Sequence, residues 1–302
     1  MKAPRAVHCA GAPRDLGRDQ GEALGAHVRE SVREGALARL RAWLPGSRAA
    51  RIWRDLETYF PHHAERTLGL SLGARVPTRA LAARLAELVT GDGGLAVGVG
   101  AGGGLLGRSF GPSLGTEELV VRHSAPDNDY RSVELAPVWS VASAIGVNEH
   151  GLAATATALA CDDPLLRGCA APAALLVQDV LQRFDTVEKA LEWAQRRPAG
   201  GWASLLLADA SGRTAGVVIE GRKRSLLAER GGLVTGLGPA AALAVLEKSL
   251  ADAPAPDAAS LARLLGELPA QPRLVAVADP ARRRLGVARG DAALEWSRVG
   301  PE

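Results

Sequence analysis

The stretch LAVGVGAGGGLLGRSF, residues 95–110, decides between two classes of fold. Its glycines over 98–103 match G-x-G-x-x-G, the fingerprint of a dinucleotide-binding loop, in which a helix must begin directly after the glycines. Further glycines and Pro112 follow instead, and both residue types disfavour a helix. We therefore predict a β-hairpin with strands at 95–99 and 104–110, and we do not expect a nucleotide-dependent oxidoreductase.

A helical segment precedes this hairpin. From residue 14 to about residue 88, apolar residues recur at helical spacing, and prolines and glycines divide the pattern into successive helices. Beyond Thr90 the sequence changes to short apolar runs separated by Gly, Asn, Asp and Pro. We therefore divide the chain into a helical N-terminal segment, residues 1–90, and a mixed core, residues 91–302, within one compact domain.

The core alternates predicted strands with predicted helices. Turn signals bound short apolar runs that we predict as strands, at 118–123, 132–135, 141–147, 152–159, 204–208, 216–220, 274–277 and 284–288. Amphipathic spacing predicts helices at 173–184, 187–195, 240–250 and 258–268. Adjacent hairpins build antiparallel sheets, whose outer faces the helices cover. The predicted fold class is therefore α+β.

The composition is ordinary for a globular chain and excludes several functional classes. The 302 residues carry a net charge of +3 with scattered arginines, so we expect no nucleic-acid partner. No apolar run is long enough to span a membrane, and residues 1–17 lack the apolar core of a secretory signal, so we expect no membrane partner and a cytoplasmic location. The cysteines at 9, 161 and 169 have no metal-ligand spacing, which predicts a reducing compartment.

The most informative motif is IGVNEHGLAAT at 145–155, which by itself predicts a strand, a turn and a second strand. It also resembles the G-x-N-E-x-G-L hairpin of the acyl-coenzyme A:isopenicillin N acyltransferase-like family of N-terminal-nucleophile (Ntn) hydrolases. Four further segments resemble motifs of that family in the same order, at 11–21, 105–110, 205–212 and 217–220. Together these segments extend the resemblance over most of the chain.

This resemblance implies an Ntn-hydrolase-type αββα four-layer sandwich of two antiparallel sheets with an N-terminal helical segment. It also implies self-cleavage that exposes a catalytic Cys at the start of a strand, where its own α-amine acts as the general base. An Asn of the family stabilises the oxyanion. The family acts on acyl amides and thioesters.

Compared position by position, this sequence departs from the family at its functional residues. The nucleophile region falls on Asp92, Gly93 and Gly94, where no Cys, Ser or Thr stands. Gly111 occupies the position of the family's Asp, and Gly236 that of its Asn. The combined loss implies a pseudoenzyme that neither cleaves itself nor hydrolyses amides. Such a protein would bind a small acyl or amide ligand or pair with an active relative, and the sequence sets no oligomeric state.

Other residues offer an alternative in which the chain is an enzyme. Cleavage before Thr90 would unmask its amine and give an active Ntn amidohydrolase or acyltransferase on a small acyl amide. Arg108, Asn148 and Glu149 are the candidate ligand-binding residues. The resemblance to the family's G-R-N strand implies that Arg108 contacts carboxylates in the core, and on structural grounds alone we expect Asn148 and Glu149 to form a turn.

Two adjacent histidines, His62 and His63, stand between Pro61 and the start of a predicted helix. Imidazole is a common metal ligand, but a metal site needs further ligands, and the sequence offers no evident third ligand for this pair. We therefore expect the pair to cap the helix or to lie on the surface. We expect neither a metal nor a cofactor.

Overall fold

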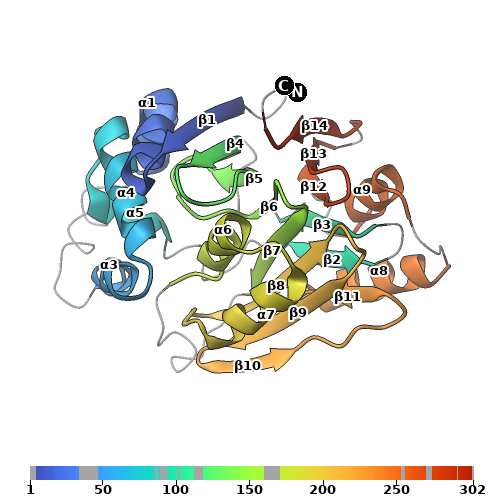
Figure 1. Ribbon diagram of the computed structural model, residues 1–302. Helices are drawn as coiled ribbons and strands as arrows, with labels where there is room; N and C mark the ends of the chain where they lie inside the picture. The colour runs from blue at the N-terminus through green and yellow to red at the C-terminus, as the bar shows by residue number, and fades with distance from the viewer. Residues whose placement is uncertain are drawn as a thin grey trace.

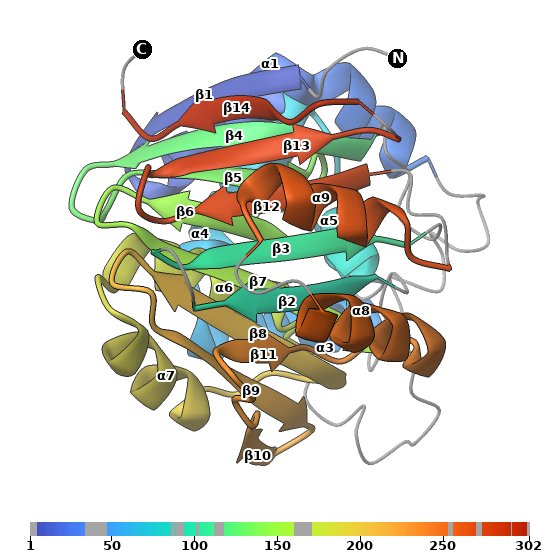
Figure 2. The same ribbon diagram turned by 90° about the vertical axis from the view of Figure 1, so that its right-hand side faces the viewer.

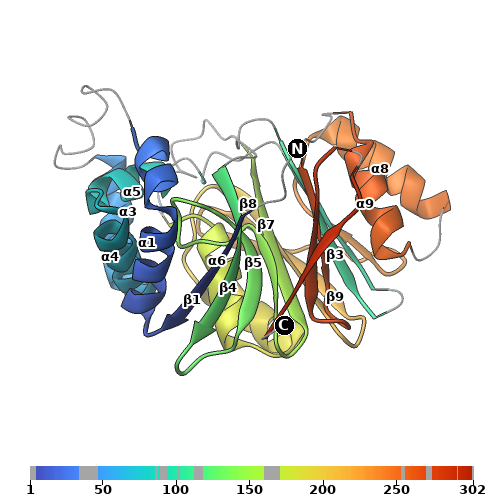
Figure 3. The ribbon, with the colours of Figure 1, turned by 90° about the horizontal axis from the view of Figure 1, so that it is seen from above.

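The computed structural model describes residues 5–33, 47–85, 88, 94–100, 103–111, 118–159, 171–252, 256–269, 274–290 and 292–300. Within this part of the chain, two β-sheets lie face to face and helices cover the outer side of each sheet (Figure 3). The arrangement is a four-layer αββα sandwich, which confirms the predicted α+β fold class.

The larger sheet has eight strands in the order β1-β4-β5-β6-β7-β8-β9-β10. They are β1 (Arg5–Gly11), β4 (Leu119–Pro126), β5 (Ser132–Pro137), β6 (Ile145–Asn148), β7 (Leu152–Leu159), β8 (Trp202–Asp209), β9 (Thr214–Glu220) and β10 (Lys223–Leu226). Neighbouring strands are antiparallel except β1 and β4, which run parallel. The sequence did not predict β1, an edge strand in which only Val7 and Cys9 are buried.

The smaller sheet has six strands in the order β11-β2-β3-β12-β13-β14. They are β11 (Leu233–Thr235), β2 (Leu95–Val99), β3 (Leu105–Phe110), β12 (Leu274–Asp279), β13 (Arg284–Ala288) and β14 (Glu295–Arg298), and all neighbours are antiparallel. Leu95 pairs with Ser109 and Val99 with Leu105, which confirms the predicted hairpin and excludes a dinucleotide loop. Gly103 and Gly104 enter β3 with φ values of 99° and 75°, a region that favours glycine.

Helices form the two outer layers (Figures 1 and 2). The larger sheet is covered by α1 (Pro13–Ser31), α3 (Arg48–Tyr59), α4 (Pro61–Ala74), α5 (Thr78–Leu85) and α6 (Ala174–Arg183), and α7 (Val187–Arg196) packs on β8 and β9. The smaller sheet is covered by α8 (Ala240–Asp252) and α9 (Ala258–Gly266). Of the helices in the described ranges, none combines the length and apolar character needed to cross a membrane.

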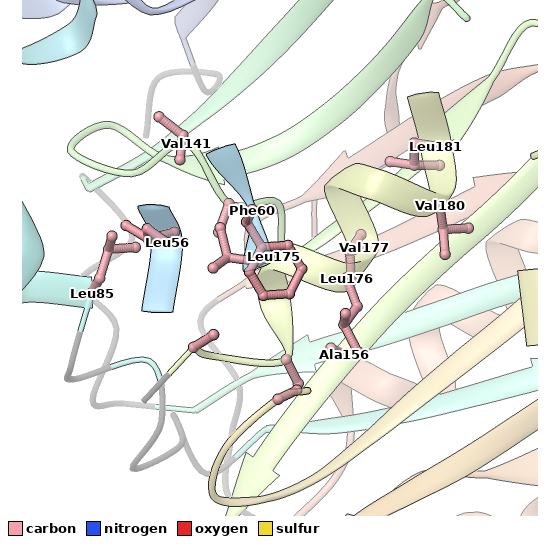
Figure 4. Close-up of a cluster of buried hydrophobic side chains, with 14 of the residues drawn as sticks. Leu56, Phe60, Leu85, Val141, Ala156, Leu175, Leu176, Val177, Val180 and Leu181 are labelled. Atoms are coloured by element: carbon pink, nitrogen blue, oxygen red, sulfur yellow. The ribbon is translucent and has the colours of Figure 1, made fainter. Parts of the chain in front are cut away.

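Three layers of apolar side chains hold the four layers of backbone together. The first lies between the larger sheet and its helices, where Figure 4 shows Leu56 and Phe60 near Leu175 of α6. The second lies between the sheets, and the third joins the smaller sheet to α8 and α9. Strands β2 and β3 are buried on both faces, which explains why β2 is a continuous run of apolar residues and glycine, whereas β3 also buries Arg108 and Ser109.

A buried ion pair lies where α1 and α6 meet the larger sheet. Arg122 of β4 and Glu134 of β5 stand opposite each other in the ladder, and both are fully buried. Arg122 Nε and Nη2 donate to Glu134 Oε2 over 2.9 and 2.6 Å. Burial raises the pKa of Glu134, but Arg122, then Arg66, and hydrogen bonds from Ser132 and Ser143 bring it down to about 2. The carboxylate is therefore fully ionised at neutral pH.

The same guanidinium fixes the elements around it. Its Nη1 donates to Gln20 Oε1 of α1 at 2.9 Å, and its Nη2 donates to Gln178 Oε1 of α6 at 2.6 Å. It also donates to two carbonyls in the loop before β6, which hold that loop in turns. As a result β6 begins at Ile145, and the strand predicted at 141–147 was wrong at its start.

Glycines let α1 and α4 pack with their backbones in contact. A Cβ added to Gly17 would lie 1.9 Å from the carbonyl oxygen of Arg66, and one added to Gly69 would lie 1.9 Å from that of Arg14. Because these neighbours are backbone atoms, a larger residue could fit only if the helices moved apart. The glycine spacing in the segment 11–21 therefore has a packing reason.

Replacing Gly17 by Ala tests this packing. The added methyl group would collide with the backbone of α4, so we expect the free energy of unfolding to fall by about 1–3 kcal/mol. Gly266→Ala is the matched control: a Cβ there would meet nothing within 4 Å, and the change should raise stability by up to about 1 kcal/mol. Urea denaturation followed by circular dichroism measures both, and equal effects would contradict the close approach.

The titration of Glu134 makes a second prediction. Its pKa of about 2 in the folded state lies below the ordinary value of 4.5, so its contribution is complete above pH 4.5 and is lost as the pH falls toward about 2. The difference corresponds to about 3 kcal/mol. Glu134→Gln removes this titration, so the variant is less stable at neutral pH but its stability should change less between about pH 5 and pH 2. Urea denaturation at several pH values measures the free energy of unfolding of both proteins, and the two values should approach each other as the pH falls. A constant difference between wild type and variant across this range would contradict the prediction.

Candidate functional site

Three of the positions predicted from the family resemblance lie at one end of the smaller sheet. Gly94 precedes β2, and Gly111 follows β3, the strand paired with β2. Gly236 follows β11, and its amide donates to the Ala96 carbonyl of β2 at 2.9 Å. All three glycines are buried. The fold thus brings together segments that are far apart in the sequence.

Several predicted residues lie outside the described ranges: Thr90, Asp92, Gly93, Cys161 and Cys169. The third cysteine, Cys9, is a free thiol buried on β1. Burial raises the pKa of the Cys9 thiol, which keeps it protonated and poorly nucleophilic.

Side chains of the larger sheet fill the space beside Gly236. A Cβ added there would lie 2.8 Å from both Ser204 Oγ and Leu206 Cδ1, and 3.3 Å from Thr157 Oγ1. These atoms come from β7 and β8 across the interface between the sheets. An Asn at this position would therefore need its neighbours to move.

The two hydroxyl groups beside Gly236 are engaged with each other and with a peptide group. Thr157 Oγ1 donates to the Leu237 carbonyl at 2.8 Å, and Ser204 Oγ accepts from the Leu237 amide at 2.9 Å. The two oxygens are 2.8 Å apart, so Ser204 donates its proton to Thr157. Among the described residues, no acid or base bonds to either hydroxyl.

Arg108 bridges the two sheets. It lies buried on β3, and its Nη1 donates to the carbonyl oxygens of Ala144 and Ala156 on the facing sheet. Its guanidinium carbon is 4.6 Å from the centroid of the Phe110 ring. These two bonds are to main-chain oxygens, because Arg108 faces the start of β6 where Ala144 and Ala156 meet, and the expected contact with carboxylates stays a prediction.

Asn148 and Glu149 form the predicted turn between β6 and β7. Asn148 Oδ1 accepts from two main-chain amides of the turn, and Nδ2 donates to the carbonyls of Leu181 and Phe184 at the end of α6. Glu149 accepts from the Arg131 amide at 2.9 Å. Asn148 is fully buried and its amide group is used on both sides, so it ties the hairpin to α6 and has no hydrogen-bonding capacity left for a ligand.

Two cavities border helix α7. The larger, of about 570 Å³, lies between α7 and strands β9–β11, and its lining includes Leu191, Leu226 and Leu227. Glu188 and Arg213, which pair at 2.6 Å, lie in the same lining. The second cavity, of about 470 Å³, is rich in arginine. Both volumes fall in the range of small-molecule sites.

Three titratable side chains lie together between α4 and α6, although the sequence alone did not place them in one site. His62 Nε2 is 2.5 Å from Asp179 Oδ1, and His63 Nε2 is 3.7 Å from the same oxygen. His63 is buried, which corrects the predicted surface position, because α4 begins at Pro61 and its first turn faces α6. Asp179 supplies the third ligand that could not be identified from the sequence, because it lies 117 residues from His62 in the chain.

The charge state of this group follows from its surroundings. Burial, then the proximity of His62, Arg66 and Arg122, lowers the pKa of His63 well below its ordinary value. The His63 ring is therefore neutral at pH 7. Within the described part of the chain, His62, His63 and Asp179 are the residues placed so that they could hold a metal ion.

No family model and no curated protein matches this sequence. Among solved structures, an N-acylethanolamine-hydrolyzing acid amidase ortholog from Caenorhabditis elegans has a TM-score of 0.51 and 12% identity, over 62% of this chain and 93% of that chain. Penicillin V acylase from Agrobacterium tumefaciens has a TM-score of 0.41 and 19% identity, over 67% of this chain and 85% of that chain. A mutant of conjugated bile acid hydrolase from Clostridium perfringens has a TM-score of 0.47 and 11% identity, over 67% of this chain and 92% of that chain.

The likeness to the acid amidase concerns the fold alone, since its identity is only 12%. It agrees with the two stacked sheets and the outer helices described above. The chain has the Ntn-hydrolase-type αββα fold, with an N-terminal helical segment that also contributes strand β1.

Proposed function

We propose that this chain is a non-catalytic protein built on an amidase fold, a pseudoenzyme that neither cleaves itself nor hydrolyses amides. The packing around Gly236 is the observation that supports this most. The position matched to an oxyanion-stabilising Asn is a glycine, and Ser204, Leu206 and Thr157 occupy the space that such a side chain would need.

Two further observations support the same conclusion. Gly111 replaces the matched Asp at the same end of the smaller sheet, so it offers no carboxylate there. The Thr157 and Ser204 hydroxyls hold the Leu237 peptide group, and no described acid or base activates them. A catalytic amidase needs a nucleophile, a base and an oxyanion donor together.

We further propose that the chain binds a small acyl amide in the cavity of about 570 Å³ beside α7. Leu191, Leu226 and Leu227 provide an apolar wall that suits an acyl chain. Glu188 and Arg213 provide an acceptor and donors that suit an amide group. The rest of the lining is mixed, since Glu192, Gln195 and Thr214 lie beside the apolar residues, and small-molecule sites likewise combine apolar walls with polar groups that orient the ligand.

The intact mass under denaturing conditions tests the loss of self-cleavage. We expect a single species of 31.3 kDa for the freshly purified wild type and for Thr90→Ala, because no nucleophile is available to split the chain. Two fragments from the wild type, with the break before Thr90 and none in the variant, would instead establish the alternative, an Ntn enzyme that processes itself there. A break within residues 91–94 would equally refute the proposal.

Ligand binding is tested at Leu226, whose side chain is 61% exposed and can be changed without unfolding the chain. Leu226→Asp places a charge in the apolar wall, so we expect the affinity for an N-acyl amide probe to fall about tenfold or more, measured by calorimetry. The matched control is Leu72→Asp on α4, which is 56% exposed and does not line the cavity. Equal affinities in all three proteins, or no binding by the wild type, would refute this site.

A further inference from the structure

The interface between α4 and α6 contains buried polar atoms without partners. Within the described part of the chain, the Oδ2 atom of Asp179 has no hydrogen-bond partner and the His63 ring makes no well-formed hydrogen bond, only a weak one with the Leu175 main chain, although both residues are 99% buried. Leaving such groups unpaired costs free energy, and native proteins usually satisfy them. This arrangement therefore calls for a binding partner.

The atoms of this group converge on one point. The ligand atoms that His62, His63 and Asp179 offer all lie within 4.8 Å of one another. Ligands bound at about 2.0–2.1 Å in a tetrahedral zinc site lie roughly 3.3 Å apart. The observed separations of 2.5 and 3.7 Å between the histidine nitrogens and Asp179 Oδ1 bracket that spacing. Small side-chain rotations would suffice to accommodate an ion.

The donor set identifies the class of ion. Two imidazole nitrogens and one carboxylate suit zinc and similar transition metals, whereas calcium and magnesium prefer oxygen ligands alone. The His62 side chain is 31% exposed, so it connects the buried pair to solvent and leaves an approach for the ion.

Two positively charged arginine side chains lie close to His62, His63 and Asp179. The Arg183 guanidinium lies 4.0 Å from Asp179 Oδ1, and its side chain is 40% exposed, so it can turn to solvent when an ion neutralises the carboxylate. Arg66 is buried and donates to Ser124 Oγ at 3.1 Å. These positive charges oppose the binding of a cation, so the carboxylate of Asp179 has to offset them.

We propose that His62, His63 and Asp179 bind one transition-metal ion of the zinc class, with the remaining coordination positions open to solvent. The site joins the first turn of α4 to the middle of α6, away from the Gly94, Gly111 and Gly236 end of the smaller sheet. It is independent of the proposed function, because neither the lost nucleophile nor the cavity beside α7 involves these residues.

Metal titration of the full chain tests the site. Protein freed of any affinity tag and of bound metal is titrated with Zn²⁺ by calorimetry, and with Co²⁺ by its visible absorption, which reports nitrogen and oxygen ligation. We expect one equivalent to bind to the wild type. His62→Ala and Asp179→Asn should each weaken binding at least tenfold, and His150→Ala, which alters an exposed histidine away from the group, should leave it unchanged.

Each outcome decides the proposal. No stoichiometric binding by the wild type would overturn it, and so would undiminished binding in His62→Ala, since the ion would then sit elsewhere, for example on a cysteine. Far-ultraviolet circular dichroism identifies any variant that fails to fold. If Asp179→Asn fails to fold, His62→Ala decides the result alone, because the His62 side chain is partly exposed. A Co²⁺ spectrum without the bands expected of imidazole ligation would count against the site.

Discussion

The contact between Arg122 and Glu134 is the constraint on which the larger sheet and its helices depend. A charge buried to this extent is stable only where every hydrogen-bonding atom finds a partner. The partners come from α1, α6 and the loop before β6, so these elements can take only the positions that satisfy the guanidinium. The apolar layers supply most of the attraction, and this network selects one arrangement among the many that attraction alone would allow.

The sequence predicts the interior of the fold better than its edges. The hairpin at 95–110 and the paired helices at 174–196 follow from local turn chemistry and from periodicity. The four strands that it missed, β1, β10, β11 and β14, are the outermost strands of the two sheets. An edge strand has one hydrogen-bonded neighbour and is often short, so its apolar signal is weak and its place depends on contacts distant in the chain.

The polar groups of the candidate sites were harder to predict, for a related reason. The sequence predicts an amphipathic helix at 173–184, yet the polar residues Gln178, Asp179 and Gln182 of α6 are all buried. The groups that cover them come from distant parts of the chain: His62 of α4 lies 117 residues from Asp179, and Arg122 lies 56 residues from Gln178. Arg108 gives a similar case: its burial follows from its place on β3, but its carbonyl partners depend on how the two sheets face each other.

The parallel pairing of β1 with β4 affects how firmly the N-terminal segment is attached to the rest of the chain. Strand β1, α1 and α4 all precede residue 86, yet β1 is hydrogen-bonded to the core along Arg5–Gly11 and Gln20 reaches Arg122 beneath the sheet. The N-terminal segment is therefore interlocked with the rest rather than appended to it. A nick in the backbone between the two would leave a noncovalent heterodimer that elutes from a sizing column as one particle, and the pieces would part only when the whole fold is undone.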